Sequence, residues 1–185
     1  MKPSKYYYIL AVAIFIVAIA SGMIFGKNFP GADEYAENSF APFGFLKNLS
    51  PFFIFLIIFL NNTIKTLIMI LLGFLLGIYP FYFIATNGFL LGLVMIMVGD
   101  RLGYPVVIAG ILPHGIFELT ALIIGTAYGF WLGVRFAKKI RFRYPFRPYL
   151  NRALAVYLKI ILPLLFVAAV IEAWLTPWLI NLTLD

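Results

Sequence analysis

The only histidine of the chain and one of its seven acidic residues lie four positions apart, as His114 and Glu118. Both fall in a long apolar run, and Pro113 just before them predicts the start of a helix. Side chains at positions i and i+4 of a helix project from the same face. Ionisable groups at membrane depth are costly and usually face a protein interior, a partner or a water-filled cavity. The pair is therefore the first candidate for a functional site.

An imidazole nitrogen and a carboxylate oxygen are ligands that a metal ion accepts. The pair His114 and Glu118 supplies only two ligands, so a metal site would need an asparagine, water or a second subunit. The metalloprotease signature requires two histidines, and serine or threonine nucleophiles lack a second base here. A hydrogen-bonded structural pair, a metal or ion site, and catalysis stay open in that order. We expect no enzymatic activity and no cofactor.

Three asparagines are the groups best suited to satisfy this pair. Asn61, Asn62 and Asn87 fall at or near membrane depth, where amides bond across helices or to backbone groups freed by a helix break. We therefore expect an intramembrane polar cluster of these three residues with His114 and Glu118. Lys65 is expected to reach an interface or to pair with Glu118. Glu172 is expected near the outer interface.

Composition defines the class of protein. Hydrophobic residues make up 64% of the 185 positions and charged residues only 11%, with a mean hydropathy of +1.03. Soluble domains carry about a quarter charged residues, and a chain of this length cannot hide so much apolar surface in a core. Cysteine is absent, which excludes disulfides and thiolate sites, and the lack of cysteine and glutamine fits a thermophilic source. Lipid is the expected solvent.

The apolar runs predict an all-α polytopic membrane helix bundle of about five spans, one of them long or interrupted, forming a single transmembrane domain. A polar outer loop at 25–49 and a basic inner loop at 135–152 separate some of the spans. The run 51–83 is longer than one span requires, and Pro80 is expected to end its helix. The spans are expected at about 6–24, 51–79, 84–99, 113–134 and 153–176.

Charge predicts the orientation. The basic segment 135–152 contains seven cations and no acid, which equals the whole net charge of +7. Positive segments remain in the cytoplasm, so this segment and the N-terminus with Lys2 and Lys5 are expected inside, and the C-terminus outside. The protein is expected in the cell membrane as a multi-pass protein. The basic block is interpreted first as a topology signal and only second as a nucleic-acid or lipid patch, and we expect no nucleic-acid partner.

Glycines recur every fourth residue at Gly125, Gly129 and Gly133, and the same spacing separates Gly73 from Gly77 and Gly88 from Gly92. Small residues at this spacing let helix backbones approach closely in lipid. They predict helix packing, within one chain or in a homo-oligomer.

Four elements, in order, resemble the stage II sporulation protein M family of integral membrane proteins. They are Phe59-Leu60-Asn61-Asn62, the Gly73-to-Gly77 helix, Asn87-Gly88-x-x-x-Gly92, and Leu112-Pro113-His114-Gly115-Ile116-Phe117-Glu118. The resemblance covers roughly residues 50–180. It implies a small multi-span protein without established enzymatic activity, similar to a scaffold that holds peptidoglycan-degrading partners at the septal membrane of spore-forming bacteria. Relatives in archaea, which do not sporulate, imply a role that is not tied to engulfment.

The expected function is therefore a non-enzymatic membrane scaffold or assembly protein. Its expected partners are the lipid bilayer, further copies of itself, and membrane or extracytoplasmic proteins. The alternative is a small transporter or ion-binding protein in which the interrupted helix and the His114–Glu118 face line a site at the midplane. A transporter needs a polar pathway reachable from both sides, whereas a scaffold needs none.

Overall fold

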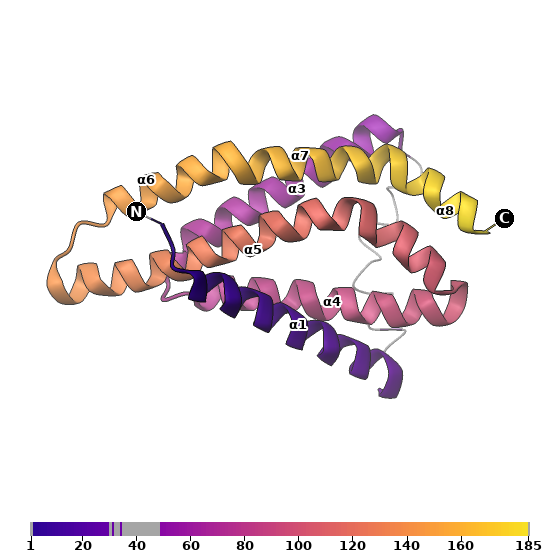
Figure 1. The fold of residues 1–185 in the computed structure, drawn as a ribbon, viewed down its shortest axis with the longest axis horizontal. Coiled ribbons are helices and arrows are strands. Elements are labelled where there is room, and N and C mark those ends of the chain that lie inside the picture. The colour runs from indigo at the N-terminus through magenta and orange to yellow at the C-terminus, as the bar shows by residue number, and fades with distance from the viewer. Residues whose placement is uncertain (1, 30, 32–33, 35–48, 185) are drawn as a thin grey trace.

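The computed structural model describes residues 2–29, 31, 34 and 49–184. In this part of the chain, five helical segments are long and apolar enough to cross a membrane, so the predicted all-α membrane bundle is confirmed. Figure 1 shows successive segments running in opposite directions. They are α1 (Lys5–Asn28), α3 (Pro51–Leu71) with the short helix η2 (Leu72–Phe74), α4 (Ile78–Leu102), α5 (Tyr104–Phe142), and a final stretch of α6 (Arg147–Val156), η3 (Tyr157–Ile161), α7 (Leu162–Val170), η4 (Ile171–Leu175) and α8 (Thr176–Leu184).

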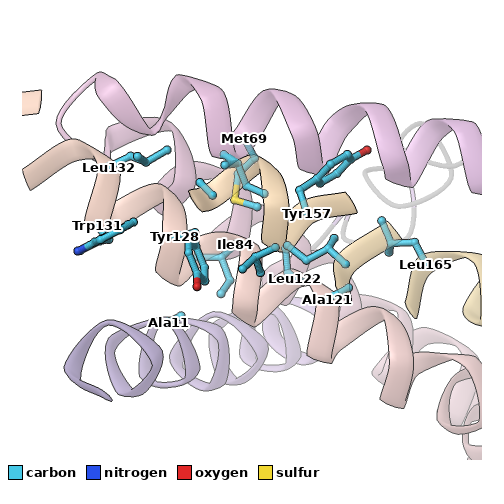
Figure 2. Packing of buried hydrophobic residues seen from close by; sticks show 14 of the residues in the cluster. Ala11, Met69, Ile84, Ala121, Leu122, Tyr128, Trp131, Leu132, Tyr157 and Leu165 are labelled. Atoms are coloured by element: carbon cyan, nitrogen blue, oxygen red, sulfur yellow. The ribbon is translucent and has the colours of Figure 1, made fainter. Parts of the chain in front are cut away.

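Helix α5 is the central element, because it contacts α1, α3, α4 and the final stretch. Its residues Tyr128, Trp131 and Leu132 are almost fully buried. In Figure 2 they lie among Met69 of α3 and Ile84 of α4. Helix α1 packs chiefly along α4. Side chains on α5 can therefore reach partners on every neighbouring span.

The chain reverses direction between α3 and α4, at a point where the sequence predicted one long helix. Helix α3 ends at Leu71, and Leu76 and Gly77 adopt positive φ values of 55° and 81°. Pro80 was predicted to end a helix, and this prediction is wrong. Pro80 lies in the first turn of α4, where a missing N–H costs no helical hydrogen bond. The second span is therefore shorter than 51–79, and the third begins at residue 78 and not at 84.

Helix α5 also begins earlier than predicted. Gly103, with φ of 90°, precedes its first residue, Tyr104, and Pro113 lies inside the helix instead of starting it. A proline inside a helix removes one backbone hydrogen bond and bends the helix, and Figure 1 shows α5 changing direction along its length. Neighbouring helices make such a residue tolerable in a membrane bundle. The predicted fourth span, 113–134, thus lies within a longer helix that extends beyond it at both ends.

The basic segment 135–152, predicted as a loop, is mostly helical. Helix α5 continues to Phe142, and α6 begins at Arg147 after a short turn. Lysine and arginine are good helix formers and are favourable near a helix C-terminus. Arg143 ends α5 with φ of 57°, and its N–H donates to the Lys139 carbonyl at 2.9 Å. We call residues 135–152 the α5–α6 hairpin.

The final stretch is helical from residue 147 to residue 184, beyond both predicted limits of 153 and 176. Two of its parts, η3 and η4, are π-helical turns. Helix α1 runs to Asn28, which shortens the predicted outer loop 25–49. Most of that loop (residues 30, 32–33 and 35–48) lies outside the described residues.

The N-terminus and the α5–α6 hairpin lie at one end of the bundle, whereas the α4–α5 turn and the C-terminus lie at the other (Figure 1). The two positive clusters of the sequence are therefore on the same side of the bundle. Helix α5 has 39 residues, which corresponds to about 58 Å against a hydrocarbon core of about 30 Å. The hairpin accordingly projects beyond the other helix ends.

The glycines of α5 pack against α3 and the start of α4 within the same chain. A Cβ atom at Gly129 would lie 2.6 Å from Cγ of Pro80, and one at Gly133 would lie 2.7 Å from the backbone nitrogen of Gly77. At Gly125 it would lie 2.8 Å from Cε of Met69. Gly88 and Gly92 of α4 approach the backbone of α1 in the same way. These contacts bring helix backbones close together, as small residues at this spacing do in lipid.

Candidate functional site: an intramembrane polar centre

Helix α5 carries His114 and Glu118 one turn apart, and both side chains are half-buried. Because α5 is surrounded by the other spans, these side chains meet groups from two of them. We call the six residues that meet here the polar centre: Asn61, Asn62, His114, Glu118, Glu172 and Thr176.

Helix α3 provides the amides of the centre. The Asn62 side-chain nitrogen donates to Oε1 of Glu118 at 3.1 Å, and the Asn61 nitrogen donates to Oδ1 of Asn62 at 3.2 Å. Residues 56 positions apart in the chain are thereby joined through their side chains. The structure brings four of the five residues of the predicted cluster together: Asn61, Asn62, His114 and Glu118.

Glu172 is one of two members of the centre, with Thr176, that the sequence did not reveal. It was expected near the outer interface, but η4 places it beside α5, half-buried. The ligand atoms of His114, Glu118 and Glu172 lie within 4.8 Å of one another. The signal that singled out Glu118, an acid inside an apolar run, also applied to Glu172. The prediction placed Glu172 at the interface because this residue lies close to the end of the predicted span 153–176.

The final stretch contacts the centre a second time through Thr176. Its hydroxyl lies 3.3 Å from Nδ1 of His114, and the threonine is only 6% exposed. Glu172 and Thr176 are four residues apart across a π-helical turn, a feature common at functional sites in helices. The other π-helical turn carries Tyr157, whose hydroxyl donates to the Thr63 carbonyl of α3 at 3.0 Å. Both π-helical turns thus face the bundle interior.

Two further residues lie beside the centre without a bond to it in the described structure. Asn87 donates to the Phe83 carbonyl of its own helix at 2.8 Å, so its amide satisfies α4 and not Glu118. Lys65 is exposed. Among the described residues no ion pair joins Lys65, or any other lysine or arginine, to Glu118 or Glu172. The expected pair of Lys65 with Glu118 is therefore not formed.

Two cavities meet at Glu118. The smaller, of about 150 Å³, is lined by residues of α1, α4 and α5 that include Asn87 and His114. The larger, of about 400 Å³, lies beside α3 and is lined by residues that include Asn61, Asn62 and Lys65. Glu118, Asn87 and Leu122 line both cavities. The carboxylate of Glu118 is therefore reachable from two sides of α5.

The chemistry of this arrangement is that of cation or proton binding. Two carboxylates this close repel each other when both are ionised, and a shared proton or a bound cation removes the repulsion. One imidazole and two carboxylates form a ligand set that Zn²⁺ and other divalent ions accept. Asn62 fixes one oxygen of Glu118, and Thr176 bonds one imidazole nitrogen, as partners of metal ligands commonly do. The second imidazole nitrogen, Nε2, has no hydrogen-bond partner among the described residues.

An antiparallel bundle of membrane-length helices around a shared polar centre defines a multi-span integral membrane protein. The sequence matches the family model for stage II sporulation protein M over residues 11–177. The chain belongs to that family. The match begins within α1, so it extends further toward the N-terminus than the resemblance seen in residues 50–180. Searches of curated proteins and of solved structures found no match.

Proposed function

We propose that this protein is a non-enzymatic assembly protein of the membrane, a scaffold whose helix bundle presents its outer faces and outer loop to partners. The observation that carries the proposal is the close backbone contact at the glycine crossings. Gly73 and Gly129 bring η2 against α5, and Gly92 brings α4 against α1. A carrier moves one part of its bundle against another, whereas such contacts favour a bundle that keeps one shape.

The outward faces of the bundle supply apolar surface for partners within the membrane. Along α1, Ile9, Ile16 and Val17 are each more than half exposed. In the cell these side chains meet lipid, a second copy of the chain or another membrane protein. The family match is compatible with this role, because its name, stage II sporulation protein M, refers to a developmental stage and to no reaction.

A photo-reactive amino acid placed at outward positions tests the scaffold proposal in native membranes. Suitable positions are Val17 on α1, Ile68 on α3 and Leu158 on the final stretch, all of which are exposed. We expect a discrete protein adduct at one of these faces and lipid adducts at the others. An adduct of twice the mass of the chain identifies a homo-oligomer. Lipid adducts alone at all three positions would contradict the proposal.

The polar centre favours a second candidate function, an ion-binding or small transport protein. Its support is the convergence of His114, Glu118 and Glu172 within 4.8 Å. Calorimetric titration of the purified protein with Zn²⁺ and Mn²⁺ tests this candidate. Binding should be lost in Glu118→Gln and Glu172→Gln and kept in Asp100→Asn, a control at an exposed acid of α4.

Flux measurements separate the two candidates. In sealed vesicles a transporter should dissipate a proton or cation gradient, and Glu118→Gln should abolish this flux. With a scaffold, the gradient should persist as long as it does in protein-free vesicles. Binding of a metal without flux would make the centre a structural metal site within a scaffold.

A further inference from the structure

The α5–α6 hairpin carries positive charge and contains no acidic residue of its own. Between Glu118 and Glu172 there is no acidic residue, and eight lysines and arginines fall in this interval. None of them forms an ion pair with an acid in the part of the chain that the structure describes. The acids Glu118 and Glu172 belong to the polar centre, in the bundle interior. An anion from outside the chain is the natural partner of this end.

A cavity of about 390 Å³ opens in the hairpin. Two cations, Arg135 and Lys138, line it together with three aromatic residues, Phe142, Tyr144 and Tyr149. Helix α5, the turn and α6 each contribute at least one of these side chains. The cavity is therefore built by the folding of the hairpin on itself, and it combines positive charge with tyrosine hydroxyl groups.

Arg135 is held in one orientation by two aromatic rings. Its guanidinium carbon lies 4.7 Å from the ring centre of Tyr149 and 5.7 Å from that of Trp131. The two rings meet nearly at right angles, at 81°. The Nε atom of Arg135 is buried and has no hydrogen-bond partner among the described residues. A planar guanidinium with five donors, held against two aromatic rings, is suited to a tetrahedral oxyanion through its terminal N–H groups.

The position of the cavity along α5 agrees with the level of lipid headgroups. Arg135 directly follows Val134 and is the first cation after the apolar run of α5. It lies 17 residues beyond Glu118, which corresponds to about 25 Å of helix. That distance leads from the membrane interior to the polar headgroup layer. Basic pockets at this level are known recognition sites for anionic headgroups.

We propose that the hairpin cavity binds a phosphate ester group, with Arg135 as its main donor and Lys138 as a second cation. The phosphate comes either from an anionic phospholipid of the surrounding leaflet or from a soluble phosphate compound. Arginine recognises phosphate oxygens through paired, charge-assisted hydrogen bonds, and lysine contributes a point charge. The site is independent of the polar centre, so it does not rest on the proposed function.

Trp131 provides a local reporter for the test. In a Trp174→Phe, Trp178→Phe background it is the only tryptophan, and it borders Arg135. The protein in a neutral maltoside detergent is titrated with phosphatidylglycerol, with inorganic phosphate, and with diacylglycerol, which has the same chains without phosphate. We expect a saturable fluorescence change with phosphatidylglycerol and none with diacylglycerol. If inorganic phosphate alone gives the change, or displaces the lipid at millimolar concentration, a soluble phosphate compound is the source.

Arg135→Gln should weaken binding by roughly tenfold or more, equivalent to about 1.4 kcal/mol, and Arg135→Lys should restore only part of the loss. Arg152→Gln is the matched control, because Arg152 is an exposed cation of the same hairpin that does not line the cavity. If Arg135→Gln and Arg152→Gln weakened binding equally, the positive charge of the hairpin would attract anions without a defined site. That result would overturn the proposal. An equal response to diacylglycerol, or no response to either phosphate source, would also overturn it. Lys138→Gln, at an exposed cavity residue, gives the same test if Arg135→Gln does not fold.

Discussion

The polar centre and the α5–α6 hairpin both contain ionisable side chains, but their surroundings differ. In the centre, Glu118 of α5 accepts a hydrogen bond from Asn62 of α3, and Glu172 of the final stretch lies beside His114 of α5. In the hairpin, the guanidinium of Arg135 contacts the faces of Trp131 and Tyr149. Side chains in the centre therefore join helices to one another. The hairpin leaves its donors available to a group outside the chain.

The largest effect is expected at the close contact between Gly129 of α5 and Pro80 at the start of α4. Gly129→Ala places a methyl group 2.6 Å from Pro80, so α4 and α5 must separate. We expect a loss of about 1–3 kcal/mol in the free energy of unfolding, as for other overpacked cores. Thermal unfolding in detergent measures the change.

Gly115→Ala is the matched control for this change. Gly115 is a second buried glycine of α5, where the nearest atom to a new Cβ lies at an ordinary 3.5 Å. Alanine is the better helix former by about 1 kcal/mol, so Gly115→Ala should leave stability unchanged or raise it. Equal destabilisation by both substitutions would show that the glycines act through something other than close helix contact.

The next effect, no larger than the first, is expected from breaking the bond between α3 and α5. Glu118→Ala leaves the Asn62 amide without its acceptor, at a cost of about 1–3 kcal/mol for an orphaned buried group. Glu118→Gln keeps an acceptor and should be better tolerated. The coupling between Asn62→Ala and Glu118→Ala in a double-mutant cycle should be about 0.6 kcal/mol, and at most about 1.7. Additive losses would place the two side chains in independent environments.

A still smaller effect on stability is expected in the hairpin. Arg135→Ala removes the contacts with Trp131 and Tyr149, and we expect a loss of about 0.5–1 kcal/mol, typical of cation–π contacts at accessible sites. Salt should reduce binding of anionic lipid to the native protein more than it reduces the stability of the fold. A stability loss larger than that of Glu118→Ala would reverse the difference between the two regions.

The last prediction concerns the orientation of the protein in the membrane and not its stability. We infer that the hairpin and the N-terminus face the cytoplasm, because positive segments are retained there. In this cysteine-free chain, Arg143→Cys should not react with a membrane-impermeant maleimide in intact cells. Trp178→Cys, at an exposed site of α8, should react. The opposite labelling pattern would invert the proposed topology, and the phosphate site would then face outward.

The number of spans and the central pair could be predicted because both depend on local patterns. Apolar length indicates a membrane span, and the i, i+4 spacing fixes the shared face of His114 and Glu118. The boundaries of the helices were less predictable, because a proline occurs both at helix ends and inside helices. Pro80 and Pro113 were interpreted as the end and the start of helices, but Pro80 lies in a first turn and Pro113 inside a helix.

Glu172 could not be placed from the sequence for a different reason. Its direction depends on two π-helical turns, which follow from packing against α3 and α5 and have no pattern of their own in the sequence. The basic hairpin was misread because low hydropathy was equated with a loop, although lysine and arginine continue a helix well beyond the membrane. The amide–acid bond between Asn62 and Glu118 needed the helix packing as well as the residue types.

The number of residues in the final stretch determines which face of the helix carries Glu172 and Thr176, and this constrains how the protein can evolve. Each residue added to or removed from a helix rotates everything that follows by about 100°. A deletion within Tyr157–Ile161 would leave the hydropathy of the span intact, yet it would rotate Glu172 and Thr176 away from α5. Substitutions on the outward face of this span are therefore expected to accumulate freely among related chains. Insertions and deletions between the hairpin and Glu172 are expected to be eliminated by selection.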